Sequence, residues 1–278
     1  MLKVKVIGIG AAGGKAAIAA IEKIPGFDEC VRIINTTEKD IPGQYQELFM
    51  PMQQDSLGGC GKERSKSKNL AIAALQDGTI DLKSFLEADD TPIIANYINF
   101  LGFNVHIMAF TGFDDDVRGL KNTIDFFKEI DDLGISDRIA IETISNKKLL
   151  DIDGGNRSKA EAEANDEFVF KLEILMGRMI ESSSQNIDET DLFKLSVATH
   201  GYMMIENRIF DSKIKNQKEF NNLLNEILDD TKSLETNKGV ERIGVILNVS
   251  ESTLNHIDND FKVLRERYGE PLEFFRHI

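Results

Sequence analysis

The sequence predicts an α/β fold: a Rossmann-like domain built on a parallel sheet, then a long central helix, and then a smaller α+β C-terminal domain. Three observations support this prediction. A short apolar run at residues 4–9 passes through glycines into an alanine-rich helix, as a strand buried on both faces does. Apolar residues at spacings of three and four form a stripe through residues 158–185. From Gly201 onward, shorter strand and helix patterns alternate, which indicates a second domain.

The predicted domains therefore cover residues 1–157 and 186–278, on either side of the helix at 158–185. In the first domain, we expect strands at 4–9, 31–34, 104–110 and 138–144, and helices at 15–24, 69–76, 82–87, 93–101 and 117–133. Turn residues favour a long loop with at most a short helix at 36–54. In the second domain, we expect strands at 201–210, 240–249 and 272–277, and helices at 216–232 and 258–267.

Composition and charge narrow the class of protein. The chain has 278 residues, of which 41% are apolar and 29% charged, as in soluble globular proteins. Its net charge of −14 argues against a nucleic-acid-binding face. No stretch reaches the roughly 20 apolar residues that span a bilayer, and no export signal precedes the first strand. We therefore expect a cytoplasmic protein with no membrane segment, in which Cys30 and Cys60 are reduced.

The glycines after the first apolar run predict a phosphate-binding loop. Glycine allows a ligand to approach the backbone closely, and the free N–H groups of a helix start favour a phosphate. The loop also fits a dinucleotide fingerprint, Gly8-x-Gly10-x-x-Gly13, but that reading needs an acidic residue after the next strand, where Asn35-Thr36-Thr37 stands. A plain tight turn is the third reading.

A second glycine-rich stretch, residues 56–61, leads into a basic helix start. It fits a second phosphate loop and, equally well, a solvated start of a helix. Further along, an acidic box follows the long helix, with Asn186, Asp188 and Asp191 at its defining positions. Gly201-Tyr202-Met203-Met204 comes shortly after it.

The order of these features resembles the tubulin superfamily, and in particular the FtsZ-like GTPases. The resemblance covers most of the chain, and the acidic box with the Gly-Tyr-x-Met motif is its most specific part. It implies a tubulin/FtsZ-like fold with a GTP-binding domain. It also implies a filament protein that assembles with itself head to tail, binds GTP or GDP with Mg²⁺, and hydrolyses GTP on assembly. The residues that would bind the metal are left open.

The resemblance also assigns residues. It implies phosphate contacts from two glycine loops, formed by Gly8, Gly10, Ala11, Ala12, Gly13, Gly14 and by Gly58, Gly59, Gly61. It implies further nucleotide contacts from Asn35, Asp115, Asp116 and Arg118, and guanine contacts from Asn146, Asn165 and Asp166. Catalysis would come from Asn186, Asp188 and Asp191, acting on the nucleotide of the neighbouring subunit. Alternatively, Asp188 and Asp191 are ordinary acids of a helix first turn, and Asn165 and Asp166 are solvated helix positions.

The chain departs from the pattern at three points. The strand and the Gly-Gly-Gly-Thr-Gly-Thr-Gly loop expected before Thr91-Pro92 are absent, and Glu87-Ala88-Asp89-Asp90 stands there instead. Thr37 replaces an acid, and Glu161 stands where an aromatic residue often stacks on guanine. We expect that the sequence omits residues between Asp90 and Thr91, because losing a central strand would leave its neighbours unpaired. If the loop is truly lost, the chain is a non-hydrolysing protein that binds a nucleotide or a partner. An NAD-linked enzyme is the remaining alternative.

Overall fold

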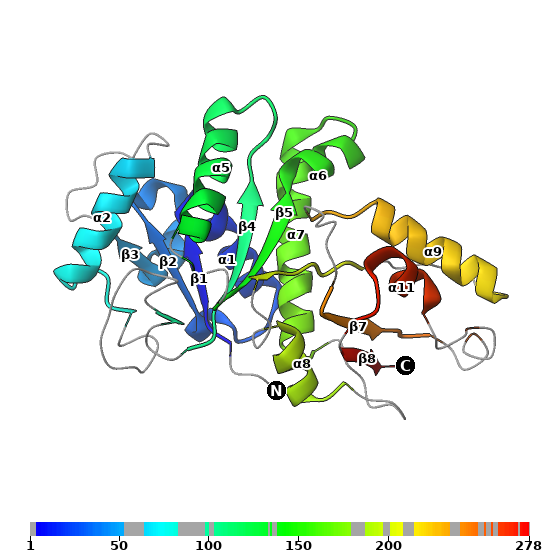
Figure 1. The fold of residues 1–278 in the computed structure, drawn as a ribbon. Coiled ribbons are helices and arrows are strands. Elements are labelled where there is room, and N and C mark those ends of the chain that lie inside the picture. Colours follow the sequence, from blue (N-terminus) through cyan, green and yellow to red (C-terminus); the bar gives the residue numbers. More distant parts are fainter. Residues whose placement is uncertain are drawn as a thin grey trace.

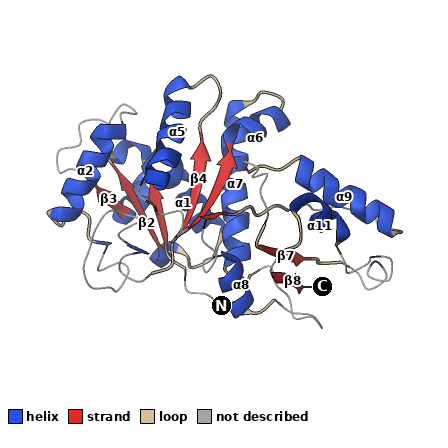
Figure 2. Cartoon of the chain, viewed as in Figure 1, coloured by secondary structure: helices blue, strands red, loops and turns tan. Residues whose placement is uncertain are grey.

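The computed structural model describes residues 4–52, 64–82, 98–99, 103–132, 134, 138–178, 187–196, 201–207, 214–233, 240–249, 253, 257, 261–271 and 273–277. In these residues, helices surround three parallel sheets (Figures 1 and 2). The predicted α/β class with a Rossmann-like parallel sheet is confirmed. None of the described helices is both long enough and apolar enough to span a bilayer.

The first sheet contains β1 (Val6–Ile9), β2 (Val31–Asn35) and β3 (Phe49–Pro51), all parallel. Helix α1 (Gly10–Lys23) follows β1 directly and packs on β1 and β2 through Ala17, Ala20 and other small residues. A 3₁₀ helix, Asp28–Cys30, precedes β2. The region predicted as a loop, 36–54, contains two more 3₁₀ helices, Glu38–Asp40 and Gly43–Leu48, and then β3. The prediction for 36–54 was therefore wrong at β3. That strand is only three residues long and ends in a proline, which a sheet tolerates at its edge.

The second sheet contains β4 (His106–Thr111), β5 (Ala140–Ser145) and β6 (Gly201–Tyr202). Its helices are α5 (Val117–Asp132) and α6 (Asn146–Ile152), while α2 (Arg64–Gln76) lies beside the first sheet (Figure 1). Strand β5 is buried along its whole length. The strand predicted at 201–210 pairs over only two residues, and these pair with β5 of the first domain.

Helix α7 (Arg157–Leu175) runs between the sheets and the C-terminal part of the chain (Figure 1). It ends earlier than predicted, because Gly177 has a positive φ of 72° and closes the helix. The Arg178 N–H donates to the Glu173 carbonyl at 3.0 Å and the Gly177 N–H to the Ile174 carbonyl at 2.9 Å, which is a Schellman motif. At 1.5 Å per residue, α7 is roughly 28 Å long. Residues 179–185 of the predicted helix lie outside the described part.

The C-terminal part contains α8 (Glu189–Ser196), α9 (Gln217–Asp229), β7 (Arg242–Ile246), α11 (Lys262–Tyr268) and β8 (Glu273–His277). It has its own apolar core, centred on Phe220 and Phe261, whose rings are 5.9 Å apart. Strands β7 and β8 pair in parallel. This separate core fits a second domain, although the boundary at residue 186 remains a prediction.

Candidate nucleotide site

A cavity of about 1760 Å³ lies between the two larger sheets. Every residue from Val4 to Gly13 lines it on one side, and every residue from Phe103 to Phe113 on the other. Successive side chains of a strand point to opposite faces of the sheet, so a cavity lined by all of them runs along the strand edge. Among the described strands, β1 pairs only with β2, and β4 only with β5. In the described part of the chain, the cavity is thus a slot between two sheet edges.

The glycine loop lies at the carboxyl end of β1. A Cβ on Gly8 would approach the Gly13 carbonyl oxygen to 2.4 Å and the Ala17 Cβ to 2.9 Å, so only glycine allows α1 to start so close to its strand. Gly10 has a φ of 71°, which glycine adopts without strain. Ile9, the residue before α1, provides no side-chain cap. The first N–H groups of α1 therefore face the cavity end without a capping side chain, an arrangement that suits an anion.

The structure brings most of the predicted binding residues to this cavity. Those that line it are Gly8, Gly10, Ala11, Ala12, Gly13, Asn35, Asp116, Asn146 and Asn165. The Asn146 carboxamide donates to the Thr111 carbonyl at 2.8 Å, which joins the ends of β4 and β5. The Asp116 carboxylate accepts from the Gly119 N–H at 2.9 Å at the start of α5. In the described part of the chain, no residue hydrogen-bonds the Asn165 carboxamide.

Four predicted binding residues do not line the cavity, namely Gly14, Asp115, Arg118 and Asp166. Gly14 is buried, and a Cβ on it would lie 3.2 Å from a methyl of Ile33. Asp115 pairs with Arg157 at 3.5 Å, and Asp166 pairs with Lys23, the last residue of α1. Gly58, Gly59, Gly61 and Asn186 lie outside the described residues. The binding roles of all these residues stay predictions.

Asp188 and Asp191 cap α8. The Asp191 N–H donates to the Asp188 carboxylate at 2.9 Å, and the Asp188 N–H donates to the Asp191 carboxylate at 3.4 Å. This reciprocal arrangement is a capping box at the start of α8. Neither residue lines the cavity. Helix α8 lies at the end of α7 that is far from the glycine loop (Figure 1).

Sequence reasoning missed a chain of charged residues at the cavity. Lys15 and Arg157 both line it, as does Glu161. The Lys15 ammonium is 3.4 Å from one Glu161 oxygen, and the Arg157 guanidinium is 3.6 Å from the other. The guanidinium also lies 4.2 Å from the centre of the Phe113 ring. The one available signal was Glu161 itself, which stands where an aromatic residue was expected.

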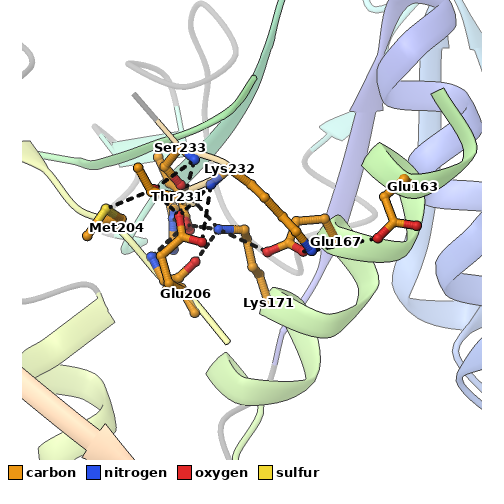
Figure 3. Close-up of polar contacts among 11 residues, drawn as sticks. Glu163, Glu167, Lys171, Met204, Glu206, Thr231, Lys232 and Ser233 are labelled. Atoms are coloured by element: carbon orange, nitrogen blue, oxygen red, sulfur yellow. Dashed lines mark hydrogen bonds and ion pairs between the residues drawn. The ribbon is translucent and has the colours of Figure 1, made fainter. Parts of the chain in front are cut away.

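A buried polar network lies further along α7 (Figure 3). The fully buried Lys171 ammonium donates to the Glu142 carboxylate at 2.6 Å and to the Ser233 hydroxyl at 3.3 Å, and it also contacts the Ile205 carbonyl. Glu167 lies 3.5 Å from the same ammonium. These contacts join β5, α7, the segment after β6 and the segment after α9.

Two further residues extend this network towards the C-terminal part. The Glu206 carboxylate accepts from the Lys232 and Ser233 N–H groups at 3.1 Å, and the Lys232 ammonium donates to Glu167 at 2.6 Å. The Lys232 carbonyl also accepts from the Ser145 N–H at 2.8 Å. The network therefore fixes the position of α7 against β5, the segment after β6 and the segment after α9.

The pKa values of Glu142 and Lys171 are both shifted from their ordinary values. Burial alone would raise the pKa of Glu142, but contact with His106 and the charges of Lys171 and His106 lower it below its ordinary value. Burial alone would lower the pKa of Lys171, but the charges of Glu142 and Glu206 raise it. The His106 and Glu142 side chains are 3.5 Å apart, which is at the limit of a hydrogen bond. Both partners are thus held in their charged forms.

The described residues contain no group of three or more His, Cys, Asp or Glu side chains that could hold a metal ion.

The glycine loop, parallel strands and long helix fit a tubulin/FtsZ-like fold, and comparison with solved structures shows that fold. TubZ of Clostridium botulinum phage c-st matches with a TM-score of 0.70 and 18% identity, over 99% of this chain and 88% of that one. A GTPγS-form protofilament of TubZ from Bacillus thuringiensis serovar israelensis matches with a TM-score of 0.68 and 19% identity, over 99% and 85%. An empty FtsZ dimer of M. jannaschii matches with a TM-score of 0.66 and 15% identity, over 99% and 83%.

At these identities the likeness concerns the fold. No protein-family model matches the sequence, and no curated protein matches it either. The fold predicted from the sequence, a tubulin/FtsZ-like one, is confirmed.

Proposed function

We propose that this chain is a GTP-binding filament protein that assembles with itself and hydrolyses GTP when assembled. The observation that carries this proposal is the meeting of Gly8–Gly13, Asn35, Asn146 and Asn165 at one cavity. Backbone N–H groups of the loop suit the phosphates, and the carboxamides suit a base and a sugar. The similar structures include TubZ protofilaments in GTPγS and GDP forms, which supports the same ligand and assembly here.

In this proposal, the acidic box serves the next subunit. It lies at the opposite end of α7 from the glycine loop, so head-to-tail stacking would bring the box of one subunit to the cavity of its neighbour (Figure 1). Each Asp uses one carboxylate oxygen in the capping box, and no described residue occupies the other oxygen. Those oxygens would orient the attacking water and help to hold Mg²⁺. Hydrolysis would then rest on positioning and electrostatics rather than on covalent chemistry.

Asp191→Ala tests whether the acidic box acts on the nucleotide of the neighbouring subunit. GTP affinity should stay nearly unchanged, since Asp191 serves the neighbour's nucleotide, while turnover per subunit should fall by roughly tenfold or more, the scale for losing a positioning group. Wild-type turnover per subunit should rise with protein concentration. Asp132→Ala is the matched control, because Asp132 is an exposed acid at the end of α5 that does not line the cavity. Turnover that is independent of concentration, or loss of GTP binding by monomeric Asp191→Ala, would contradict the proposal.

A second candidate function is nucleotide or partner binding without hydrolysis. The slot between β1 and β4 favours it, because a chain without the strand and glycine loop expected there would lack part of its phosphate site. The mutual capping of Asp188 and Asp191 also explains these residues without catalysis. GTP that stays intact after long incubation with Mg²⁺ under assembling conditions would favour this candidate.

Intact-mass spectrometry of the natural protein separates the two candidates. We expect a mass above the 31.2 kDa of this sequence. The excess should be roughly 1–2 kDa, the size of one strand and loop of ordinary length. The added residues should lie between Asp90 and Thr91, and should be apolar first and then glycine-rich with Ser or Thr. A mass equal to that of the sequence would make the non-hydrolysing function the better one.

A further inference from the structure

Glu161 is a carboxylate at the cavity whose partners differ from those of Asp166, the acid that the sequence assigned to the base. Glu161 lines the cavity with both oxygens between cations, Lys15 at 3.4 Å and Arg157 at 3.6 Å. Its side chain is 43% exposed, and that of Lys15 is 56% exposed. Ion pairs at this exposure are weak and exchange partners easily. The Glu161 carboxylate can therefore exchange these cations for hydrogen bonds to a ligand at little cost in free energy.

The spacing along α7 puts Glu161 beside the other candidate for base contact. Arg157, Glu161 and Asn165 are four residues apart, so they share one face of the helix, and all three line the cavity. Asp166 is the next residue round the helix. Its carboxylate pairs with Lys23 at the far end of α1, and it does not line the cavity.

We propose that Glu161, with Lys15 opposite it, recognises the guanine base, in the role that the sequence suggested for Asp166. This inference rests on the proposed GTP site and names the residues that would make it selective. A carboxylate can accept hydrogen bonds from both N1–H and the exocyclic amine of guanine. The Lys15 ammonium, which pairs with Glu161, can donate a hydrogen bond to O6 of guanine. Adenine would point an unprotonated N1 towards the carboxylate, and this repulsion would exclude it.

Glu161→Gln tests the assignment with four nucleotides. A glutamine amide matches the edge of xanthine, whose C2 carries an oxygen acceptor in place of the amine donor of guanine. Competition against a fluorescent GTP analogue should show that wild-type protein prefers GTP over ITP, XTP and ATP. In Glu161→Gln, we expect GTP affinity to fall by roughly tenfold to hundredfold, the range for a hydrogen bond to a charged group. XTP affinity should rise, and the preference of GTP over ITP should shrink.

Glu163→Gln is the matched control, because Glu163 is on the same helix, is also 43% exposed, and does not line the cavity. This variant should bind the four nucleotides in the same order of affinity as the wild type. Asp166→Asn is the rival variant. If Asp166→Asn switches the preference towards XTP while Glu161→Gln leaves it unchanged, the base is recognised by Asp166 and this inference is wrong. It is also wrong if Glu161→Gln binds all four nucleotides like the wild type. A wild-type protein that binds no nucleotide would overturn the proposed function itself.

Discussion

Helix α7 carries two charged clusters that differ in their contact with water. Near its start, Glu161 pairs with Lys15 and Arg157 at the edge of the cavity, with 43% of its side chain exposed. About three turns further on, Lys171 pairs with Glu142 and Glu167 and has no exposed side-chain surface. Both clusters pair carboxylates with cations, at 3.4 and 3.6 Å in the exposed cluster and at 2.6 and 3.5 Å in the buried one.

The difference in burial gives the two clusters different tasks. Exposed ion pairs contribute roughly 0–1 kcal/mol, because water and salt screen them and the long side chains lose entropy. A buried pair is expensive to break, since each partner is then left as a charge without water. The exposed cluster can therefore exchange its partners for a ligand, whereas the buried network fixes α7 against β5 and the segment after α9. Helix α7 thus carries exchangeable ion pairs near its start and a fixed buried network further along.

The largest effect is expected for Lys171→Met. This change leaves the buried Glu142 without its ammonium partner, and the Ile205 carbonyl and the Ser233 hydroxyl lose a donor, while Glu167 keeps Lys232 at 2.6 Å. We expect the free energy of unfolding to fall by roughly 3–5 kcal/mol, the cost of breaking a buried pair from one side. Urea denaturation followed by circular dichroism measures it. The double variant Lys171→Met/Glu142→Gln should recover part of the loss. A single variant within about 1 kcal/mol of wild type would show that the network is not rigid.

A smaller effect is expected from pH. The folded pKa of Glu142 is lowered, so its contribution is present above the ordinary carboxyl pKa and is lost as the pH falls through the folded pKa. The folded pKa of Lys171 is raised, so its contribution is present below the ordinary value of 10.5 and is lost as the pH rises above it. Wild-type stability should thus decline at both extremes.

Glu142→Gln isolates the acidic part of this pH dependence. The variant should lose less free energy of unfolding than the wild type between neutral pH and acid, because one titrating carboxylate is gone. Each proton taken up on unfolding contributes roughly 1.4 kcal/mol per pH unit to the slope. If the two stability curves run parallel below pH 4.5, the ordinary carboxyl pKa, then folding does not lower the pKa of Glu142.

The parts of the fold that local pattern determines were predicted well from the sequence. Strands β2, β4 and β5 lie within about two residues of their expected positions, because apolar runs between turn signals mark buried parallel strands. The end of α7 was missed because the apolar stripe continues past Gly177, and the positive φ of that glycine is a backbone property that periodicity does not reveal. Strand β3 was missed because its three residues carry no periodic signal.

The candidate site could be predicted only in part. Gly8 and Gly10 are explained by local geometry, and the sequence pattern identified both. The pairing of Lys15 with Glu161 and of Lys171 with Glu142 joins residues that are 146 and 29 positions apart. No local pattern reveals such contacts, since they depend on how α7 packs on α1 and β5. The same holds for Asp166, whose contact with Lys23 lies across the two helices.

The smallest effect is expected for Lys15→Ala, measured without nucleotide. The pair with Glu161 is exposed, and Glu161 keeps Arg157 as a second cation after the change. Alanine also has a higher helix propensity than lysine, by a few tenths of a kcal/mol, which offsets part of any loss. We therefore expect the free energy of unfolding to change by less than about 1 kcal/mol. If the free energy of unfolding fell by more than about 2 kcal/mol, the Lys15 pair would be desolvated like that of Lys171, because only a desolvated pair is worth that much. Glu161 would then not be free to exchange its partners for a base, and the contrast between the two ends of α7 would fail.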